Sequence, residues 1–145
     1  MYFPLFVDIS DKKILVAGAG KIAARRVETL LPFAGSITVV APDICESIEK
    51  WEREGKICCE RRPFVESDLE GADIVLAATD REEINTRIWE ACKRKGIPVN
   101  TADKKERCDF YFPSIIKKDN LVIGINSSGT QPEKVREMRK KIEKL

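Results

Sequence analysis

The sequence predicts an α/β fold: a Rossmann-like doubly wound parallel sheet, followed by a β-hairpin and a C-terminal helix. Two observations support this prediction. Short apolar runs alternate with segments of helical periodicity through the first hundred residues, as in a parallel sheet covered by helices. A glycine-rich turn, Gly18 to Ala23 (GAGKIA), joins the first apolar run to the first helical segment. The pattern then changes after Asp103, where hairpin spacing replaces the alternation.

The expected strands are apolar or rich in β-branched residues, which suits a sheet that is buried on both faces. They cover residues 14–17, 36–40, 57–60, 73–78 and 97–100. The expected helices carry apolar residues at intervals of three and four. They cover residues 22–31, 44–54 and 82–95, and Gly96 is a stop signal for the last of them.

A hairpin is expected from 110–116, through a turn at 117–120, to 121–125. Thr130 to Glu133 then predicts a capping-box helix start, with Pro132 in the first turn. Apolar residues recur along this final helix, so it needs a surface to cover. A second subunit is the expected surface, and the chain's own sheet is the alternative.

Composition excludes several classes of partner. The 26 basic and 24 acidic residues leave a net charge of +2, which creates no field that favours nucleic acid or a membrane, so small molecules are expected. The five cysteines form no C-x-x-C pair and the chain has no histidine, so we expect reduced thiols, no metal site and a cytoplasmic location. The start MYFPLFVDIS lacks a basic region and contains Pro4, so neither a signal peptide nor a membrane span is expected.

The glycine-rich turn matches the G-x-G-x-x-A fingerprint of dinucleotide binding. Gly18 permits a tight turn, Gly20 lets the backbone approach a pyrophosphate, and Ala23 lets helix and strand pack closely. The amides and dipole of the following helix would then face the phosphates. Since the motif lies between a strand and a helix, dinucleotide binding is favoured over a simple turn.

Asp43 follows the second expected strand, about twenty residues beyond the motif, where a carboxylate can bind the adenosine ribose hydroxyls. It lies just past the strand end, after Ala41 and Pro42, so a helix N-cap is an equal alternative. No arginine stands beside it to hold a 2′-phosphate, which favours NAD over NADP.

Several segments together resemble one family. They are FPLFVDISDKKILVAGAGKIAARR, ITVVAPD, DIVLAATD followed by Asn85, VNTAD, and FYFPSIIKKDNLVIGINSSGTQP with its charged final helix. Their order and spacing resemble the precorrin-2 dehydrogenase family, the N-terminal module of siroheme synthase, over essentially the whole chain. The resemblance implies NAD-dependent oxidation of precorrin-2 to sirohydrochlorin in siroheme or related tetrapyrrole biosynthesis, in some members combined with ferrochelation.

The expected catalytic residue is Asp103, which follows the strand at 97–100, where ligands of an open α/β sheet collect. It matches the family's catalytic aspartate, and capping of its own loop is the alternative. The resemblance adds cofactor-contacting positions, each of which could instead be an ordinary surface, core or turn residue. They are Lys21, Ile22, Pro42, Asp43, Thr79 and Asp80.

On the substrate side, the resemblance points to the loop Ser127, Ser128, Gly129 and Thr130, whose hydroxyls and amides suit an anionic ligand. An ordinary polar cap is the alternative, and Asn126 departs from the serine that is common in the family. We therefore expect residues 1–112 to form the NAD-binding domain and residues 113–145 a dimerisation region. We expect no counterpart of the family's further helical domain within these 145 residues.

Two other classes remain as alternatives. An NAD-sensing regulatory module, such as the nucleotide-binding domain of potassium-transport regulators, explains the glycine-rich half but not the FYFPSII and INSSGTQP segments. A chelatase that works without NAD would have to rely on Asp103 and the macrocycle itself, so ferrochelation is held as a second activity rather than the main one.

Overall fold

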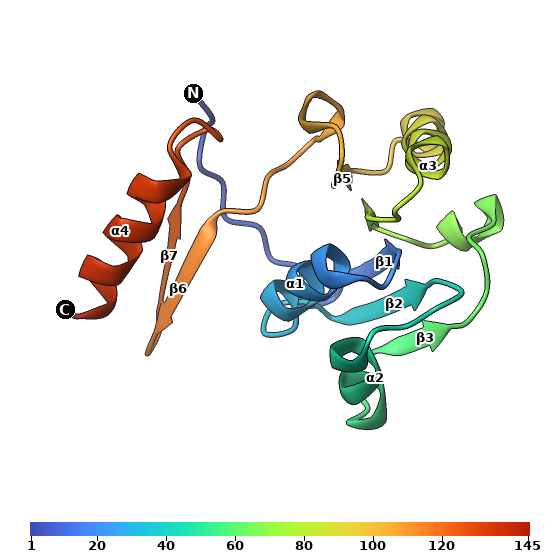
Figure 1. Cartoon of the computed structure of the whole chain (residues 1–145), viewed down its shortest axis with the longest axis horizontal. Helices are drawn as coiled ribbons and strands as arrows, with labels where there is room; N and C mark the ends of the chain where they lie inside the picture. Colours follow the sequence, from blue (N-terminus) through green and yellow to red (C-terminus); the bar gives the residue numbers. More distant parts are fainter. The chain divides into compact units, whose positions relative to one another are not determined.

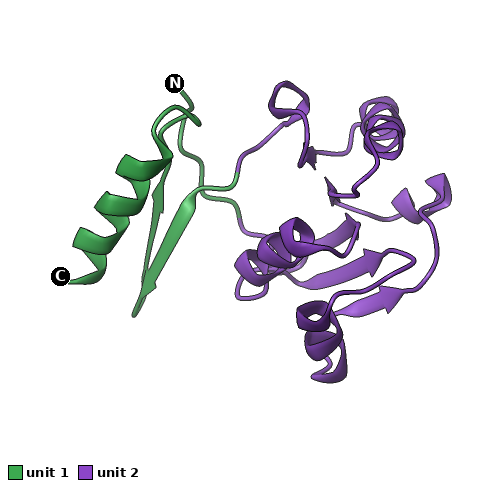
Figure 2. Ribbon diagram, in the orientation of Figure 1, with its two compact units in different colours: residues 1–7, 112–145 green, residues 8–111 purple.

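The computed structural model describes all residues 1–145, in two compact units (Figure 2). One unit is residues 8–111. The other combines residues 1–7 with residues 112–145, so the N-terminal segment groups with the C-terminal hairpin and helix rather than with the sheet domain to which the sequence assigned it. No helix is long and apolar enough to cross a membrane.

The larger unit is built on a five-stranded parallel sheet with the order β3-β2-β1-β4-β5 (Figure 1). Its strands are β1 (Lys13–Ala17), β2 (Ser36–Val40), β3 (Cys58–Glu60), β4 (Ile74–Ala77) and β5 (Val99–Thr101). Its helices are α1 (Lys21–Leu30), α2 (Glu46–Arg53) and α3 (Glu82–Lys95), with 3₁₀ turns η1 (Glu66–Leu69) and η2 (Lys105–Arg107). The predicted doubly wound parallel sheet is confirmed.

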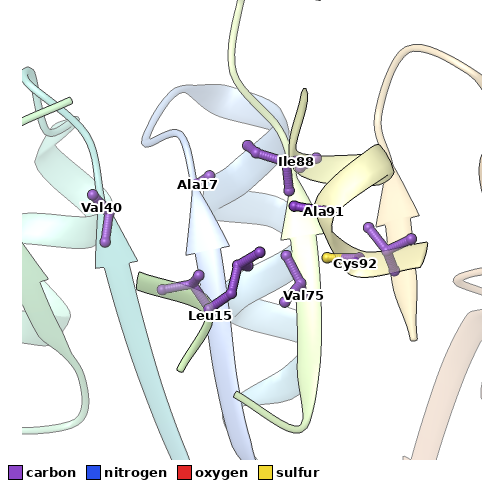
Figure 3. Close-up of a cluster of buried hydrophobic side chains, with 10 residues drawn as sticks. Leu15, Ala17, Val40, Val75, Ile88, Ala91 and Cys92 are labelled. Atoms are coloured by element: carbon purple, nitrogen blue, oxygen red, sulfur yellow. The ribbon is translucent and has the colours of Figure 1, made fainter. Parts of the chain in front are cut away.

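Both faces of the sheet are buried. Val16, Val39 and Leu76 are in register and almost fully buried on one face, which right-handed crossovers place under α1 and α2. On the other face, Leu15 and Val75 join Ile88 and Cys92 of α3 in one hydrophobic cluster (Figure 3). The apolar runs at β1 and β4 therefore correspond to strands that are buried on both faces, whereas the edge strand β3 is largely exposed.

The strand order reverses at β1. The chain moves from β1 to β2 and β3 on one side, then returns through η1 to β4 on the other side of β1. The loops that leave the carboxyl ends of β1 and β4 therefore diverge to opposite faces. Such a switch point leaves a crevice where ligands of open α/β sheets bind.

The smaller unit contains the antiparallel pair β6 (Ser114–Lys118) and β7 (Leu121–Ile125), followed by α4 (Pro132–Glu143). Asp119 adopts φ 53° in the two-residue turn, a conformation that Asp tolerates better than most residues. Helix α4 contacts β6, and Arg139 Nη1 donates to Ser114 Oγ at 3.2 Å. The predicted hairpin and terminal helix are confirmed.

Proline shifts two of the expected strand limits. The last strand of the sheet is Val99–Thr101 rather than 97–100, because Pro98 has no N–H for the ladder. The first hairpin strand begins at Ser114, after Pro113, and runs through Lys118, so the turn is shorter than the expected 117–120. The sequence located these elements but not their ends.

The predicted capping box at Thr130 is wrong. The N-cap of α4 is Gln131, and no side chain caps it. Thr130 Oγ1 instead donates to Ser127 O at 2.6 Å, which closes the preceding loop on itself. The local turn therefore takes the hydroxyl that the capping box would have used.

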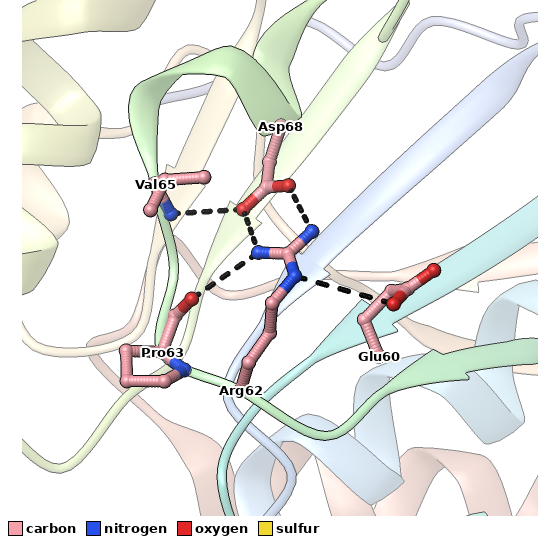
Figure 4. A network of polar contacts seen from close by, with 5 residues as sticks. All are labelled: Glu60, Arg62, Pro63, Val65 and Asp68. Atoms are coloured by element: carbon pink, nitrogen blue, oxygen red, sulfur yellow. Dashed lines mark hydrogen bonds and ion pairs between the residues drawn. The ribbon is translucent and has the colours of Figure 1, made fainter.

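A buried carboxylate fixes the connection between β3 and η1 (Figure 4). Arg62 donates from both terminal nitrogens to Asp68, at 2.6 and 3.0 Å, and Val65 N donates to Asp68 Oδ2 at 2.9 Å. The Asp68 side chain is only 8% exposed. The Arg62 hydrogen bonds, helped by the Val65 amide, hold the pKa of Asp68 below its ordinary value despite the desolvation that opposes this.

Because the folded-state pKa of Asp68 is lowered, its contribution to stability is present above the unfolded pKa of about 3.9 and is lost as the pH falls through the folded value. Asp68→Asn should lower the free energy of unfolding at pH 7 by about 1–2 kcal/mol. Urea unfolding at several pH values measures this, and the gap between variant and wild type should narrow below about pH 4.

Glu66→Gln is the control, because Glu66 belongs to the same 3₁₀ turn but forms an exposed ion pair with Arg94. It should leave stability nearly unchanged. An Asp68→Asn variant as stable as wild type at pH 7 would contradict the assigned role of the Arg62–Asp68 pair.

Candidate dinucleotide and catalytic site

The turn after β1 is held in a shape that only glycine allows. Gly18 is buried with φ +110°, and a Cβ placed on it would lie 2.2 Å from Ala78 O and 2.9 Å from Thr79 N. The Gly18 amide donates to Val40 O at 3.0 Å. The loops after β1, β2 and β4 therefore meet at this residue.

Gly20 serves a different purpose. Its φ of −90° suits any residue, and a Cβ built on it would meet nothing within 4 Å. Gly20 is the N-cap of α1, and no side chain caps this helix end. The open side of Gly20 is therefore a space from which a ligand can reach the unpaired amides of the first helical turn.

The two residues after Gly20 are both exposed. Lys21 opens α1, and Ile22 is 51% exposed although it is apolar. An exposed isoleucine beside an uncapped helix start offers an apolar surface to a ligand that binds there. The alternative of a core isoleucine is wrong for Ile22.

The loop after β2 lies beside the glycine-rich turn. Cys45 N donates to Ala19 O at 3.1 Å, which ties this loop to the turn. Pro42 and Asp43 are exposed within it. Helix α2 begins at Glu46 with Cys45 as its N-cap, so the N-cap alternative for Asp43 is wrong, and its carboxylate remains at the carboxyl end of β2.

The loop after β4 contains Thr79 and Asp80. Asp80 is exposed, whereas Thr79 is half-buried and bonded to Asn85 of α3. Thr79 N donates to Asn85 Oδ1 at 3.1 Å, and Asn85 Nδ2 donates to Thr79 O at 3.0 Å. This pair of bonds fixes the backbone that faces Gly18.

Asp103 lies just beyond β5 and is exposed. Its loop is closed by Thr101 Oγ1, which donates to Lys104 O at 2.7 Å. Its Oδ2 accepts from Asn85 Nδ2 at 3.3 Å. The alternative in which Asp103 only caps its own loop is not observed, because Thr101 fills that role.

The structure brings nine of the expected residues to one edge of the sheet, at the carboxyl ends of four strands. These are Gly18, Gly20, Lys21, Ile22, Pro42, Asp43, Thr79, Asp80 and Asp103. Asn85 belongs with them, although the sequence marked it only as part of a recognisable segment. The signal that could have identified it is a polar residue on the otherwise apolar, buried side of an amphipathic helix.

The expected substrate loop belongs to the other unit. Ser127 O accepts from Thr130 N at 3.1 Å, and Ser127 Oγ accepts from Gln131 N at 3.1 Å. Ser128 has φ 57° and Gly129 has φ 76°, and Ser128 N donates to Asn126 Oδ1. The loop is thus a self-bonded turn ahead of α4, and binding of substrate there stays a prediction.

Two thiols of the sheet unit, Cys59 and Cys92, are poor candidates for nucleophiles. Burial raises the pKa of Cys92 to about 11, and burial together with Glu52 raises the pKa of Cys59 to about 11. Both thiols are therefore protonated at neutral pH. The role of the Asp103 carboxylate at the carboxyl end of β5 stays a prediction.

These residues fit a dinucleotide. The open side of Gly20 and the uncapped start of α1 suit a pyrophosphate, and the exposed carboxylate of Asp43 follows the neighbouring strand. A doubly wound parallel sheet with a glycine-rich turn at its switch point defines a Rossmann-like dinucleotide-binding protein.

Comparison with known proteins agrees with this class. The chain belongs to the family described as "Putative NAD(P)-binding", whose model matches residues 5–114. The predicted NAD(P)-binding class is confirmed.

Curated relatives match nearly the whole chain. The siroheme synthase of Pseudoalteromonas atlantica is 38% identical over 144 residues, which is 99% of this chain and 31% of the relative. That of Nitrosospira multiformis is 39% identical over 148 residues, again 99% of this chain and 31% of the relative. The chain therefore spans about a third of the length of these relatives.

Among solved structures, "SirC, precorrin-2 dehydrogenase" superposes with a TM-score of 0.83 at 25% identity, covering 99% of this chain and 70% of that one. The similarity extends over both compact units of the chain. It confirms the predicted architecture, including the hairpin and the final helix.

The two glycines can be separated experimentally. Gly18→Ala should lower the free energy of unfolding by more than about 2 kcal/mol, because its φ is positive and its methyl would overlap backbone atoms. Gly20→Ala should lower stability by no more than about 1 kcal/mol, because Gly20 is the N-cap of α1 and has no close neighbours. It should nevertheless weaken NAD binding about tenfold, equivalent to about 1.4 kcal/mol, since its methyl projects into the open space.

Calorimetric titration with NAD and thermal unfolding of each variant measure these effects. A Gly20→Ala protein that binds NAD as tightly as wild type would contradict the position assigned to the pyrophosphate.

Proposed function

We propose that this protein is an NAD-dependent precorrin-2 dehydrogenase that produces sirohydrochlorin for siroheme or a related tetrapyrrole. One observation carries the proposal: the glycine-rich turn and the Asp103 carboxylate lie at the same carboxyl edge of the sheet, joined through Thr79 and Asn85. The name of the superposed structure and the siroheme synthase relatives support this choice of substrate.

The chemistry needs few protein groups. NAD, when bound, would supply the hydride acceptor for oxidation of the reduced macrocycle, and a proton would have to leave separately. We assign that proton to Asp103, because its carboxylate is exposed at the end of β5 and is hydrogen-bonded to Asn85, which also bonds Thr79. The protein otherwise contributes position, by holding both reactants at one sheet edge.

Each part of the dinucleotide is assigned to particular residues of this site. The amides at the start of α1 hold the pyrophosphate beside Gly20, with Lys21 and Ile22 flanking it. Asp43 accepts from the adenosine ribose hydroxyls, with Pro42 beside it, and Thr79 and Asp80 lie on the nicotinamide side. A carboxylate at position 43 favours NAD over NADP.

The substrate carries several carboxylates, and Ser127, Ser128, Gly129 and Thr130 are assigned to bind them. Two successive residues with positive φ, Ser128 and Gly129, precede the N-terminus of α4. Backbone amides in such a turn favour anions. Ferrochelation is retained as a second activity to be tested on the same carboxylate.

A second copy of this chain is the expected partner of the smaller unit. Large apolar side chains are exposed there in number: Phe3, Leu5, Phe6, Leu121 and Met138 are between 42% and 86% exposed, whereas the sheet unit exposes only Ile22 and Val65. Apolar surface concentrated in one unit is typical of an interface. A homodimer through the hairpin and final helix accounts for it.

Asp103→Asn tests the proposed chemistry. The amide cannot take the proton, so kcat should fall by a factor of about 10²–10⁴, while the Kd for NAD stays unchanged. Anaerobic assays with precorrin-2 and NAD, followed by NADH absorbance, measure this. Asp11→Asn, a carboxylate at the opposite edge of the sheet, is the matched control and should retain full activity. Full turnover in Asp103→Asn would show that Asp103 does not take the proton.

Binding of NAD by wild type without any turnover would instead favour the NAD-sensing alternative.

The double variant Leu121→Glu with Met138→Glu tests the dimer. Placing carboxylates on both exposed apolar positions should convert the dimer to a monomer, because burying unpaired charge at an interface is unfavourable. Sedimentation measures the change. Val65→Glu in the sheet unit is the control and should stay dimeric. A wild-type monomer, or a double variant that remains dimeric, would refute this placement of the interface.

A further inference from the structure

Asn85 is a polar side chain that is buried on the apolar face of α3. It is 1% exposed in the first turns of α3, among side chains that are otherwise hydrophobic on this helix face. Burying an amide is unfavourable unless its hydrogen bonds are satisfied. In this case they are: Oδ1 accepts from Thr79 N and Thr79 Oγ1, and Nδ2 donates to Thr79 O and Asp103 Oδ2.

The orientation of this amide is determined by the backbone. Thr79 N can only donate and Thr79 O can only accept, so Oδ1 must face the former and Nδ2 the latter. The second Nδ2 hydrogen is then directed at Asp103 Oδ2, 3.3 Å away. A donor, and not an acceptor, therefore faces the Asp103 carboxylate.

We propose that Asn85 is the positioning residue of the reaction. Its side chain bonds both the Thr79 backbone and the Asp103 carboxylate, and so holds the carboxylate in a fixed position relative to the Thr79 loop, which lies against Gly18. This inference rests on the proposed function. The bonds within the loop, such as Thr101 Oγ1 to Lys104 O, set the backbone of Asp103, whereas Asn85 sets its side chain. Because Asn85 donates to Oδ2, the other oxygen, Oδ1, is the one presented to the substrate proton.

The distances explain why one amide can do this. A Cβ on Gly18 would lie 2.2 Å from Ala78 O, so the Ala78–Thr79 backbone has no freedom on the glycine side. Asn85 of α3 forms hydrogen bonds with the N–H and the carbonyl oxygen of Thr79, and so holds the same backbone from the other side. Any displacement of Asn85 therefore moves Asp103 relative to the loop that borders the dinucleotide.

Asn85→Asp is the first test, because it keeps the shape and the acceptor toward Thr79 N but replaces the donor with a carboxylate oxygen that faces Asp103. The kcat should fall about 10- to 100-fold, as for a displaced reacting group, with KM for precorrin-2 little changed. Thr86→Val is the matched control: Thr86 is the next residue of α3 and bonds Arg107, not Asp103. It should leave kcat unchanged.

The double variant Asn85→Asp with Asp103→Asn supplies the decisive comparison. The exchanged pair restores one donor and one acceptor, so the midpoint of urea unfolding should return toward that of wild type. Activity should not return, and Asn85→Asp should lower kcat no further in the Asp103→Asn background. A purely structural role predicts the opposite, namely that the two losses of kcat multiply, and this result would overturn the proposal.

Failure of the proposed function can be distinguished from failure of this inference. If the wild-type protein does not oxidise precorrin-2, the proposed function fails, and the unfolding midpoints alone decide whether Asn85 and Asp103 are coupled. Additive effects of the two substitutions on unfolding would then overturn the inference, whereas recovery in the exchanged pair would support it.

Discussion

The rest of the site depends on the close approach of Gly18 to the backbone of Ala78 and Thr79. A single methyl at Gly18 would be placed 2.2 Å from Ala78 O, so the loops after β1 and β4 can meet only because residue 18 has no side chain. These loops diverge from neighbouring parallel strands at the point where the strand order reverses. The contact thus fixes how closely these loops approach each other at the sheet edge where a dinucleotide would lie.

Polar contacts extend this constraint to the catalytic side. Thr79 is bonded to Asn85, and Asn85 is bonded to Asp103 eighteen residues further along, so one buried amide joins the loops after β4 and β5. The buried Asn85 amide is fully satisfied, so it cannot move without leaving a buried polar group unpaired. The sheet supplies the scaffold, and this short network turns its edge into a site with a defined geometry.

Much of the fold could be predicted from local pattern. Apolar runs located the central strands β1 and β4 because both faces of the sheet are buried there, and Gly96 ended α3 with φ 67° as expected. Strand ends were less predictable, because Pro98 and Pro113 removed ladder donors. Thr130 and Asp43 are not helix caps, because the N-cap of α4 is Gln131 and the N-cap of α2 is Cys45.

The site was predictable in its parts but not in its connections. The glycine spacing, Asp43 and Asp103 each follow a strand, so topology alone places them at one edge. The bond between Asn85 and Asp103 joins residues 18 positions apart, and no local pattern encodes it. The most direct test of the account is the anaerobic stoichiometry of NADH and sirohydrochlorin formed by wild-type protein from precorrin-2 and NAD. The account predicts equal amounts of the two products, whereas sirohydrochlorin formed without NADH, or NAD bound with neither product formed, would contradict it.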